Sequence, residues 1–164
     1  MDLTALISSW SNSVVTVVAR FFHEYWGLGV FFLPAGLLFA RKKKALVLAL
    51  ALALLLVPVL KSVYAQPRPC ANLKVECEQD YGFPSAHAVV AFVFAAASVG
   101  SWLFFLFLPA AVFVAFSRVY LGVHSFEQVA GGVALGVVLF FVADAIVERF
   151  SSVFEGVFSW RKST

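Results

Sequence analysis

Six polar residues between positions 61 and 124 have the side-chain types needed to bind and transfer a phosphoryl group. In chain order they are Lys61, Arg68, Ser85, His87, Arg118 and His124. Arginine presents a planar fork that matches two phosphate oxygens, and lysine adds a point charge. Two histidines beside three cations can supply one nucleophile and one acid. We therefore expect a phosphate site with a reactive histidine.

The segment Pro84-Ser85-Ala86-His87 predicts the start of a helix, because proline is favoured in the first helical turn. The first N–H groups of a helix lack partners within it and carry partial positive charge, so they bind anions. Ser85 is open to two interpretations, a phosphate ligand or a plain N-cap. A single lysine or arginine at the end of a membrane span is often only an interfacial anchor, so the combination of residues carries the hypothesis.

The elements that carry these residues are predicted to be membrane helices. Of the 164 residues 62% are hydrophobic and 13% are charged, against about 45–50% apolar and about 25% charged in a soluble domain. In lipid every backbone group must be paired internally, and long, uniformly apolar runs favour helices over barrel strands. We therefore expect one all-α, polytopic membrane helical bundle over residues 1–164, with the motifs inside 61–128.

The apolar runs predict five spans and a weaker sixth. The five are residues 27–40, 45–60, the run 86–116 divided in two by the turn signal Gly100-Ser101, and 129–147. Residues 3–22 form either a weak first span or an amphipathic helix in the interface. Gly131, Gly132 and Gly136 in the last span favour close helix packing.

The orientation follows from the basic cluster Arg41–Lys44, which predicts a cytoplasmic location. Alternation of the spans then puts the phosphate-binding residues on the outer face and the C-terminal tail, with Arg149, Arg161 and Lys162, inside. We thus expect a multi-pass protein of the cell membrane with an extracytoplasmic active site. The net charge of +3 lies in short clusters without a basic stripe, which argues against nucleic-acid binding.

Three motifs in order carry a family resemblance: Lys61-x6-Arg68-Pro69, Pro84-Ser85-Ala86-His87 and Ser117-Arg118-x5-His124. They resemble the signature of the type-2 phosphatidic acid phosphatase superfamily, which includes membrane lipid phosphate phosphatases. The resemblance implies that His124 attacks phosphorus to form a phosphohistidine and that His87 protonates the departing oxygen. It implies no metal or other cofactor, and phosphate or vanadate as a site ligand. The implied phosphate-binding residues are Lys61, Arg68, Ser85, Ala86 and Arg118.

The chain departs from this pattern after the third motif. The family reads His-x3-Asp, whereas Gln128 stands in the place of the acid, and Ala86 replaces the family glycine. Gln128 can orient His124 in a slower enzyme, Glu127 can act as the acid instead, or the chain is catalytically silent or carries an introduced substitution. Loss of the equivalent carboxylate in a serine-protease triad costs about 10⁴ in turnover. Ser125-x-x-Gln128 is also a capping-box pattern.

The predicted outer loop contains the only two cysteines, Cys70 and Cys77. An outward face permits a disulfide between them, and the alternative is two thiols. Metal binding is not expected, because no further cysteine or histidine lies at ligand spacing. Glu76, Glu78 and Asp80 in the same loop are interpreted as a solvated acidic stretch, or as groups that repel stray anions.

The leading hypothesis is a phosphatase that acts on a lipid phosphate or diphosphate, such as phosphatidic acid, phosphatidylglycerol phosphate or a polyprenyl diphosphate. The alternative is a catalytically impaired relative that binds or transports anionic lipid, and Gln128 is the residue that favours it. A vanadate-dependent oxidase is disfavoured, since the known ones are soluble. The motifs do not specify the head group or the oligomeric state.

Overall fold

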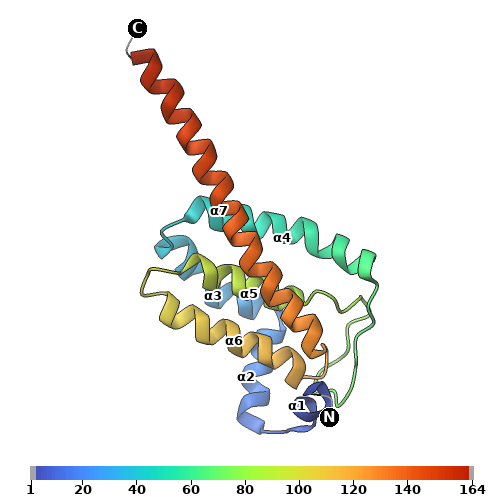
Figure 1. Cartoon of the computed structure of the whole chain (residues 1–164). Helices are drawn as coiled ribbons and strands as arrows, with labels where there is room; N and C mark the ends of the chain where they lie inside the picture. The colour runs from blue at the N-terminus through green and yellow to red at the C-terminus, as the bar shows by residue number, and fades with distance from the viewer. Residues whose placement is uncertain (1–2, 163–164) are drawn as a thin grey trace.

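The computed structural model of the chain describes the backbone of residues 3–162, with side chains for 3–24 and 27–152. In this described part the secondary structure consists of seven helices and no strand (Figure 1). The predicted all-α class is therefore confirmed. The helices are α1 (Leu3–Ser9), α2 (Ser13–His23), α3 (Tyr25–Phe39), α4 (Lys43–Tyr64), α5 (Ala86–Ala97), α6 (Phe104–Tyr120) and α7 (Phe126–Lys162).

The apolar runs of the sequence form these helices, but the helices differ in length. Two stretches are long and apolar enough to cross a membrane, Lys43–Tyr64 and Phe126–Ser152. The shorter apolar helices are Ser13–His23, Gly27–Phe39, Ala86–Ala97 and Phe104–Tyr120. The chain is thus built from membrane-type helices, and the count of six crossings stays a prediction.

Helix α5 lies at the centre of the bundle, packed against α4, α6 and α7. Most of its residues are buried, and its many alanines let the neighbouring helices approach closely. Helix α7 crosses α5 obliquely and its C-terminal half projects away from the other helices (Figure 1). The predicted close helix packing is confirmed for two of the three α7 glycines: a Cβ at Gly132 would lie 2.7 Å from the Ser85 carbonyl oxygen, and one at Gly136 would lie 2.4 Å from that of Val89. Gly131 instead lies against the Phe83 ring, which belongs to no helix.

Residues 3–22 do not form one element, so neither sequence interpretation describes them as a whole. Asn12 ends the break between α1 and α2, and its side chain caps α2 by accepting from the Val15 amide at 3.1 Å. The Tyr120 hydroxyl accepts from the Asn12 amide at 2.9 Å and donates to the Asn12 carbonyl at 3.0 Å. Helix α1 packs on α6, and Thr4 accepts from the Phe126 amide at 3.1 Å. Helix α1 therefore covers the end of the bundle at which α6 meets α7.

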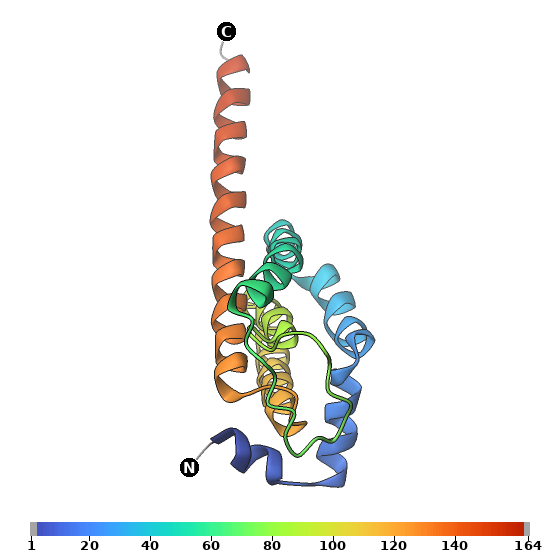
Figure 2. The same cartoon turned by 90° about the vertical axis from the view of Figure 1, so that its right-hand side faces the viewer.

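The connections bring four helix ends to one side of the molecule. Gly100, with φ +77°, lies in the predicted turn between α5 and α6. Helix α4 continues past the predicted end of its run to Tyr64, and the long connection 65–85 then leads to α5. Figure 2 shows this connection, in green, folded over the end of the bundle. The C-terminal ends of α4 and α6 and the N-terminal ends of α5 and α7 consequently meet beneath it.

Candidate active site

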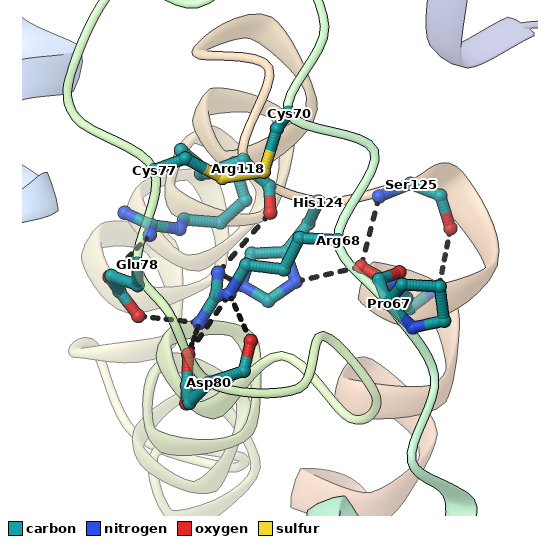
Figure 3. The surroundings of a disulfide bond; sticks show 11 residues. Pro67, Arg68, Cys70, Cys77, Glu78, Asp80, Arg118, His124 and Ser125 are labelled. Carbon is teal, nitrogen blue, oxygen red and sulfur yellow. Dashed lines mark hydrogen bonds and ion pairs between the residues drawn. A yellow bond between two sulfur atoms is a disulfide. The ribbon is translucent and has the colours of Figure 1, made fainter.

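The predicted phosphate-binding residues converge beneath the connection 65–85. Lys61 lies in the last turn of α4, and Arg118 lies near the end of α6. Ser85 immediately precedes α5, which begins at Ala86, and Arg68 belongs to the connection itself. Figure 3 shows Arg68, Arg118 and His124 side by side. The side chains of Arg68, Arg118, Ser85, His87, His124 and Gln128 are all buried or nearly so. The fold therefore gathers residues from five separate elements into one buried polar site.

The hydrogen bonds of His124 specify its tautomer. Arg68 Nη1 lies 2.7 Å from His124 Nε2, and a guanidinium has only donors, so Nε2 accepts. Gln128 Oε1 lies 3.1 Å from His124 Nδ1. The amide orientation is determined by two backbone groups, because Oε1 also accepts from the Ser125 amide at 3.2 Å and Nε2 donates to the Pro67 carbonyl at 2.9 Å. The proton therefore lies on Nδ1, and the lone pair on Nε2 faces the cations.

Gln128 has the two roles that its position in the sequence suggested. It orients the His124 ring, and it forms the reciprocal capping box, because its own amide donates to Ser125 Oγ at 3.3 Å. Glu127, by contrast, is exposed at the start of α7. Gly82 packs directly on the Gln128 amide, where a Cβ would lie 2.3 Å from Oε1. The structure thus places Gln128, and not Glu127, beside the histidine.

The surroundings keep the His124 ring neutral. Burial lowers the pKa of His124 well below its ordinary value, and the positive charges of Arg68 and Arg118 lower it further. The hydrogen bond to Gln128 acts in the opposite direction and is outweighed. At neutral pH the ring accordingly retains an unprotonated Nε2, which is the form that a nucleophile requires.

His87 lies one residue into α5 and contacts a histidine that the sequence analysis missed. Its Nε2 donates to the backbone carbonyl of His23 at 2.8 Å, and the two rings stack with centroids 6.3 Å apart. His23 Nδ1 accepts from Arg118 Nη1 at 2.8 Å. The sequence contained one usable signal, since the predicted alternation of spans places residue 23 on the same face as His87. His23 therefore joins the site as a partner of Arg118.

Two of the three acidic residues of the connection are paired with the cations, so the interpretation of this stretch as solvated is incomplete for them. Arg68 is paired with both Glu78 and Asp80 (Figure 3). Lys61 is paired with Asp80. Arg118 Nη2 lies 3.5 Å from Glu78 Oε1. Burial tends to raise the pKa of Asp80, but its hydrogen bonds with Lys61 and Arg68 outweigh this effect and lower that pKa. Asp80 is therefore a carboxylate in the resting site.

Ser85 has an unusual environment for an N-cap residue. It precedes α5 with an extended backbone, yet its side chain makes no capping hydrogen bond. Its hydroxyl is buried and, within the described part of the chain, has no hydrogen-bond partner. A buried, unpaired hydroxyl costs free energy unless a ligand or water satisfies it. This environment favours the phosphate-ligand interpretation of Ser85 over the plain N-cap.

A disulfide closes the connection beside the site. Cys70 and Cys77 are joined, with their Cα atoms 5.8 Å apart, and the ring they close separates Arg68 from Glu78 in the chain (Figure 3). Within the described residues, no group of three or more His, Cys, Asp or Glu side chains is arranged to hold a metal ion. The cross-link thus holds Arg68 close to the Glu78 carboxylate that pairs with it.

An apolar cavity reaches the polar site from the side of the bundle. Its volume is about 480 Å³, and it lies between α4 and α5, with Leu54, Val57 and Val90 in its walls. Lys61 and Asp80 line its polar part. A chain of hydrocarbon can therefore lie against the helices while a charged head group reaches Lys61.

Comparisons with known proteins identify the family of the chain. Residues 42–151 match the family described as the PAP2 superfamily. The chain is 32% identical over 136 residues to an undecaprenyl-diphosphatase of Sulfolobus acidocaldarius, covering 76% of this chain and 65% of the length of that protein. It is 32% identical over 165 residues to phosphatidylglycerophosphatase B of Bacillus subtilis, covering 85% of this chain and 77% of that protein.

Two crystal structures resemble the fold. Aquifex aeolicus LpxE superposes with a TM-score of 0.74 at 26% identity, covering 86% of this chain and 92% of LpxE. A transmembrane PAP2-type phosphatidylglycerolphosphate phosphatase of Bacillus subtilis superposes with a TM-score of 0.68 at 28% identity, covering 89% of this chain and 83% of that one. Three of these four matches are named as phosphatases, and together with the apolar helices they indicate a membrane protein. The chain belongs to the PAP2 superfamily.

Proposed function

We propose that this protein is a membrane phosphatase that hydrolyses a lipid phosphate or diphosphate through a phosphohistidine at His124. The observation that carries the proposal is the buried, neutral His124, whose Nε2 lone pair points at a cationic pocket while Gln128 Oε1 accepts a hydrogen bond from its Nδ1–H group. A neutral imidazole oriented in this way is an activated nucleophile, and the cations are positioned for the charge that develops on phosphorus.

The proposed reaction has two displacements at phosphorus. His124 Nε2 attacks, the bond to the lipid oxygen breaks, and His87 Nε2 turns from the His23 carbonyl to donate a proton to that departing oxygen. His87 then accepts a proton from water as the water attacks the phosphohistidine and releases inorganic phosphate. Throughout, Lys61, Arg68, Arg118, the Ser85 hydroxyl and the backbone N–H groups that begin at Ala86 bind the non-bridging oxygens.

The substrate class is proposed from the cavity and from the topology. The apolar cavity between α4 and α5 suits an acyl or isoprenoid chain, and Lys61 lies at its polar part. The basic cluster Arg41–Lys44 begins α4 and the site lies at its other end, about 33 Å away along a helix of 22 residues. With six crossings and that cluster in the cytoplasm, the site faces outward. An outward site favours the recycling of a polyprenyl diphosphate carrier.

The test is phosphate release by the purified protein in detergent from phosphatidic acid, phosphatidylglycerol phosphate and a polyprenyl diphosphate. His124→Ala should abolish release, and wild-type protein quenched during turnover should carry an acid-labile phosphoryl group that the variant lacks. Glu127→Gln is the matched control, because Glu127 precedes Gln128 but is exposed. Its activity should equal that of wild type. Release by His124→Ala at the wild-type rate would refute the proposed nucleophile.

A second candidate function is a non-catalytic binder or transporter of anionic lipid, and the neutral Gln128 in place of a carboxylate favours it. Such a protein would bind phosphate through the same cations without turnover. Wild-type protein that releases no phosphate, together with an active Gln128→Asp variant, would support this alternative over the phosphatase.

A further inference from the structure

The phosphate-binding cations already hold anions in the resting structure. Glu78 is paired with Arg68 and Arg118, and Asp80 is paired with Arg68 and Lys61. Three positive charges thus face two carboxylates, which leaves the site one positive charge instead of three. A phosphoryl group that enters must take the places of these carboxylate oxygens, because the same N–H donors serve both.

The carboxylates lie on the solvent side of the cations. The side chains of Arg68 and Arg118 are 2% and 0% exposed, whereas those of Glu78 and Asp80 are 31% and 48% exposed. The acidic groups can therefore turn outward into water while the buried cations stay in position.

The segment that carries the two acids is anchored on both sides. Cys77 is bonded to Cys70 on one side, and on the other the Gly82 amide donates to the Gln66 carbonyl at 2.8 Å. The four residues between these anchors include both acids. The tether keeps the two carboxylates close to the cations even when they are displaced, so they compete with a ligand at high effective concentration.

We propose that Glu78 and Asp80 determine specificity by acting as internal competitors for the phosphate site. This inference rests on the proposed function and deepens it. Inorganic phosphate and short, water-soluble phosphate esters bring only their charge and displace the carboxylates poorly. A lipid phosphate also gains binding free energy from its chain in the apolar cavity, and this gain drives the displacement. When the lipid departs, the returning carboxylates expel the phosphate product.

The test compares Glu78→Gln and Asp80→Asn with the control Glu76→Gln, which removes an exposed acid of the same loop. Binding of inorganic phosphate and of vanadate is measured by the rise in melting temperature and by inhibition of turnover. Each of the two variants should bind both anions roughly tenfold or more tightly, as expected when a hydrogen-bonded charged competitor is lost. The ratio of kcat/KM for a long-chain over a short-chain phosphate should fall to the same degree, and Glu76→Gln should match wild type.

Phosphate and vanadate binding that weakens or stays unchanged in both variants would overturn the inference, since it would mean that the carboxylates only orient the cations. Because the melting-temperature measurement needs no turnover, the two proposals can fail separately. Tighter anion binding in proteins that release no phosphate would refute the phosphatase and retain the competition. Normal turnover with unchanged anion binding would refute the competition and retain the phosphatase.

Discussion

Replacement of Gln128 by glutamate should increase turnover, because it adds the missing charge without changing the shape of the side chain. One carboxylate oxygen takes the position of Oε1, 3.1 Å from His124 Nδ1. Attack on phosphorus gives the ring a positive charge, which the present amide stabilises only as a dipole. At an effective dielectric constant of about 20, opposite charges at that distance attract by about 5 kcal/mol, equivalent to as much as 10⁴ in rate.

The same substitution carries a cost that falls on stability and not on the chemical step. The second carboxylate oxygen replaces Nε2, which donates to the Pro67 carbonyl at 2.9 Å. Two acceptors would then face each other, at a cost of about 1–3 kcal/mol. This repulsion is the same in the ground state and in the transition state. It therefore lowers the melting temperature but does not offset the gain in kcat.

The assay is kcat for Gln128→Glu and wild type across pH 5–9 in detergent. We expect kcat to rise between about 10²-fold and 10⁴-fold. The acid limb of kcat/KM should move to higher pH, since a carboxylate beside His124 raises the pKa of its ring. Gln128→Ala is the control that removes the orienting oxygen without adding charge, and its kcat should fall below that of wild type. An unchanged kcat in Gln128→Glu, with vanadate binding intact, would refute the role assigned to this residue.

Three further predictions concern the same site. Gly82→Ala pushes a methyl group into the Gln128 amide, where the Cβ would lie 2.3 Å from Oε1. We expect kcat to fall at least tenfold while helix content by circular dichroism stays constant. Full activity would mean that the amide does not orient the His124 ring. His23→Ala removes the acceptor at 2.8 Å from Arg118 and should weaken vanadate binding roughly tenfold; unchanged binding would make His23 only a packing residue. The acid limb of wild-type kcat/KM should lie below pH 6.5, because the pKa of His124 is lowered and its neutral, nucleophilic form persists to more acidic pH. An acid limb above pH 6.5 would contradict the conclusion that burial and the nearby cations lower this pKa.

The helices were predictable because their signal is local. Each apolar run is read directly from consecutive residues, and the turn at Gly100 follows from a glycine that adopts a positive φ. The break between α1 and α2 is different, since it depends on the Tyr120 hydroxyl bonding both backbone groups of Asn12. A contact between residues 108 positions apart leaves no periodic trace in residues 3–22.

The site was predictable in its residue types and less so in its partners. The ordered motifs with Lys61, Arg68 and Arg118 named the cations, because phosphate chemistry limits which side chains can serve. The partners of those cations depend on how the connection 65–85 folds, and an acidic loop looks the same in sequence whether it is solvated or paired. The pairing of Glu78 and Asp80 with the cations is therefore not visible in the sequence, which is equally consistent with a solvated stretch or with groups that repel stray anions.

The close contact between α5 and α7 has a mechanical consequence. Backbone meets backbone at Gly132 and Gly136, and the Ser85 amide donates to the Gln128 carbonyl at 3.1 Å. Neither helix can slide or rotate against the other without a clash or a broken hydrogen bond. Helices α5 and α7 therefore move as one rigid body, which keeps the relative positions of Ser85 and Gln128 constant. A substrate can therefore enter by separating the Lys61–Asp80 ion pair at the C-terminal end of α4 while α5 and α7 keep their contact.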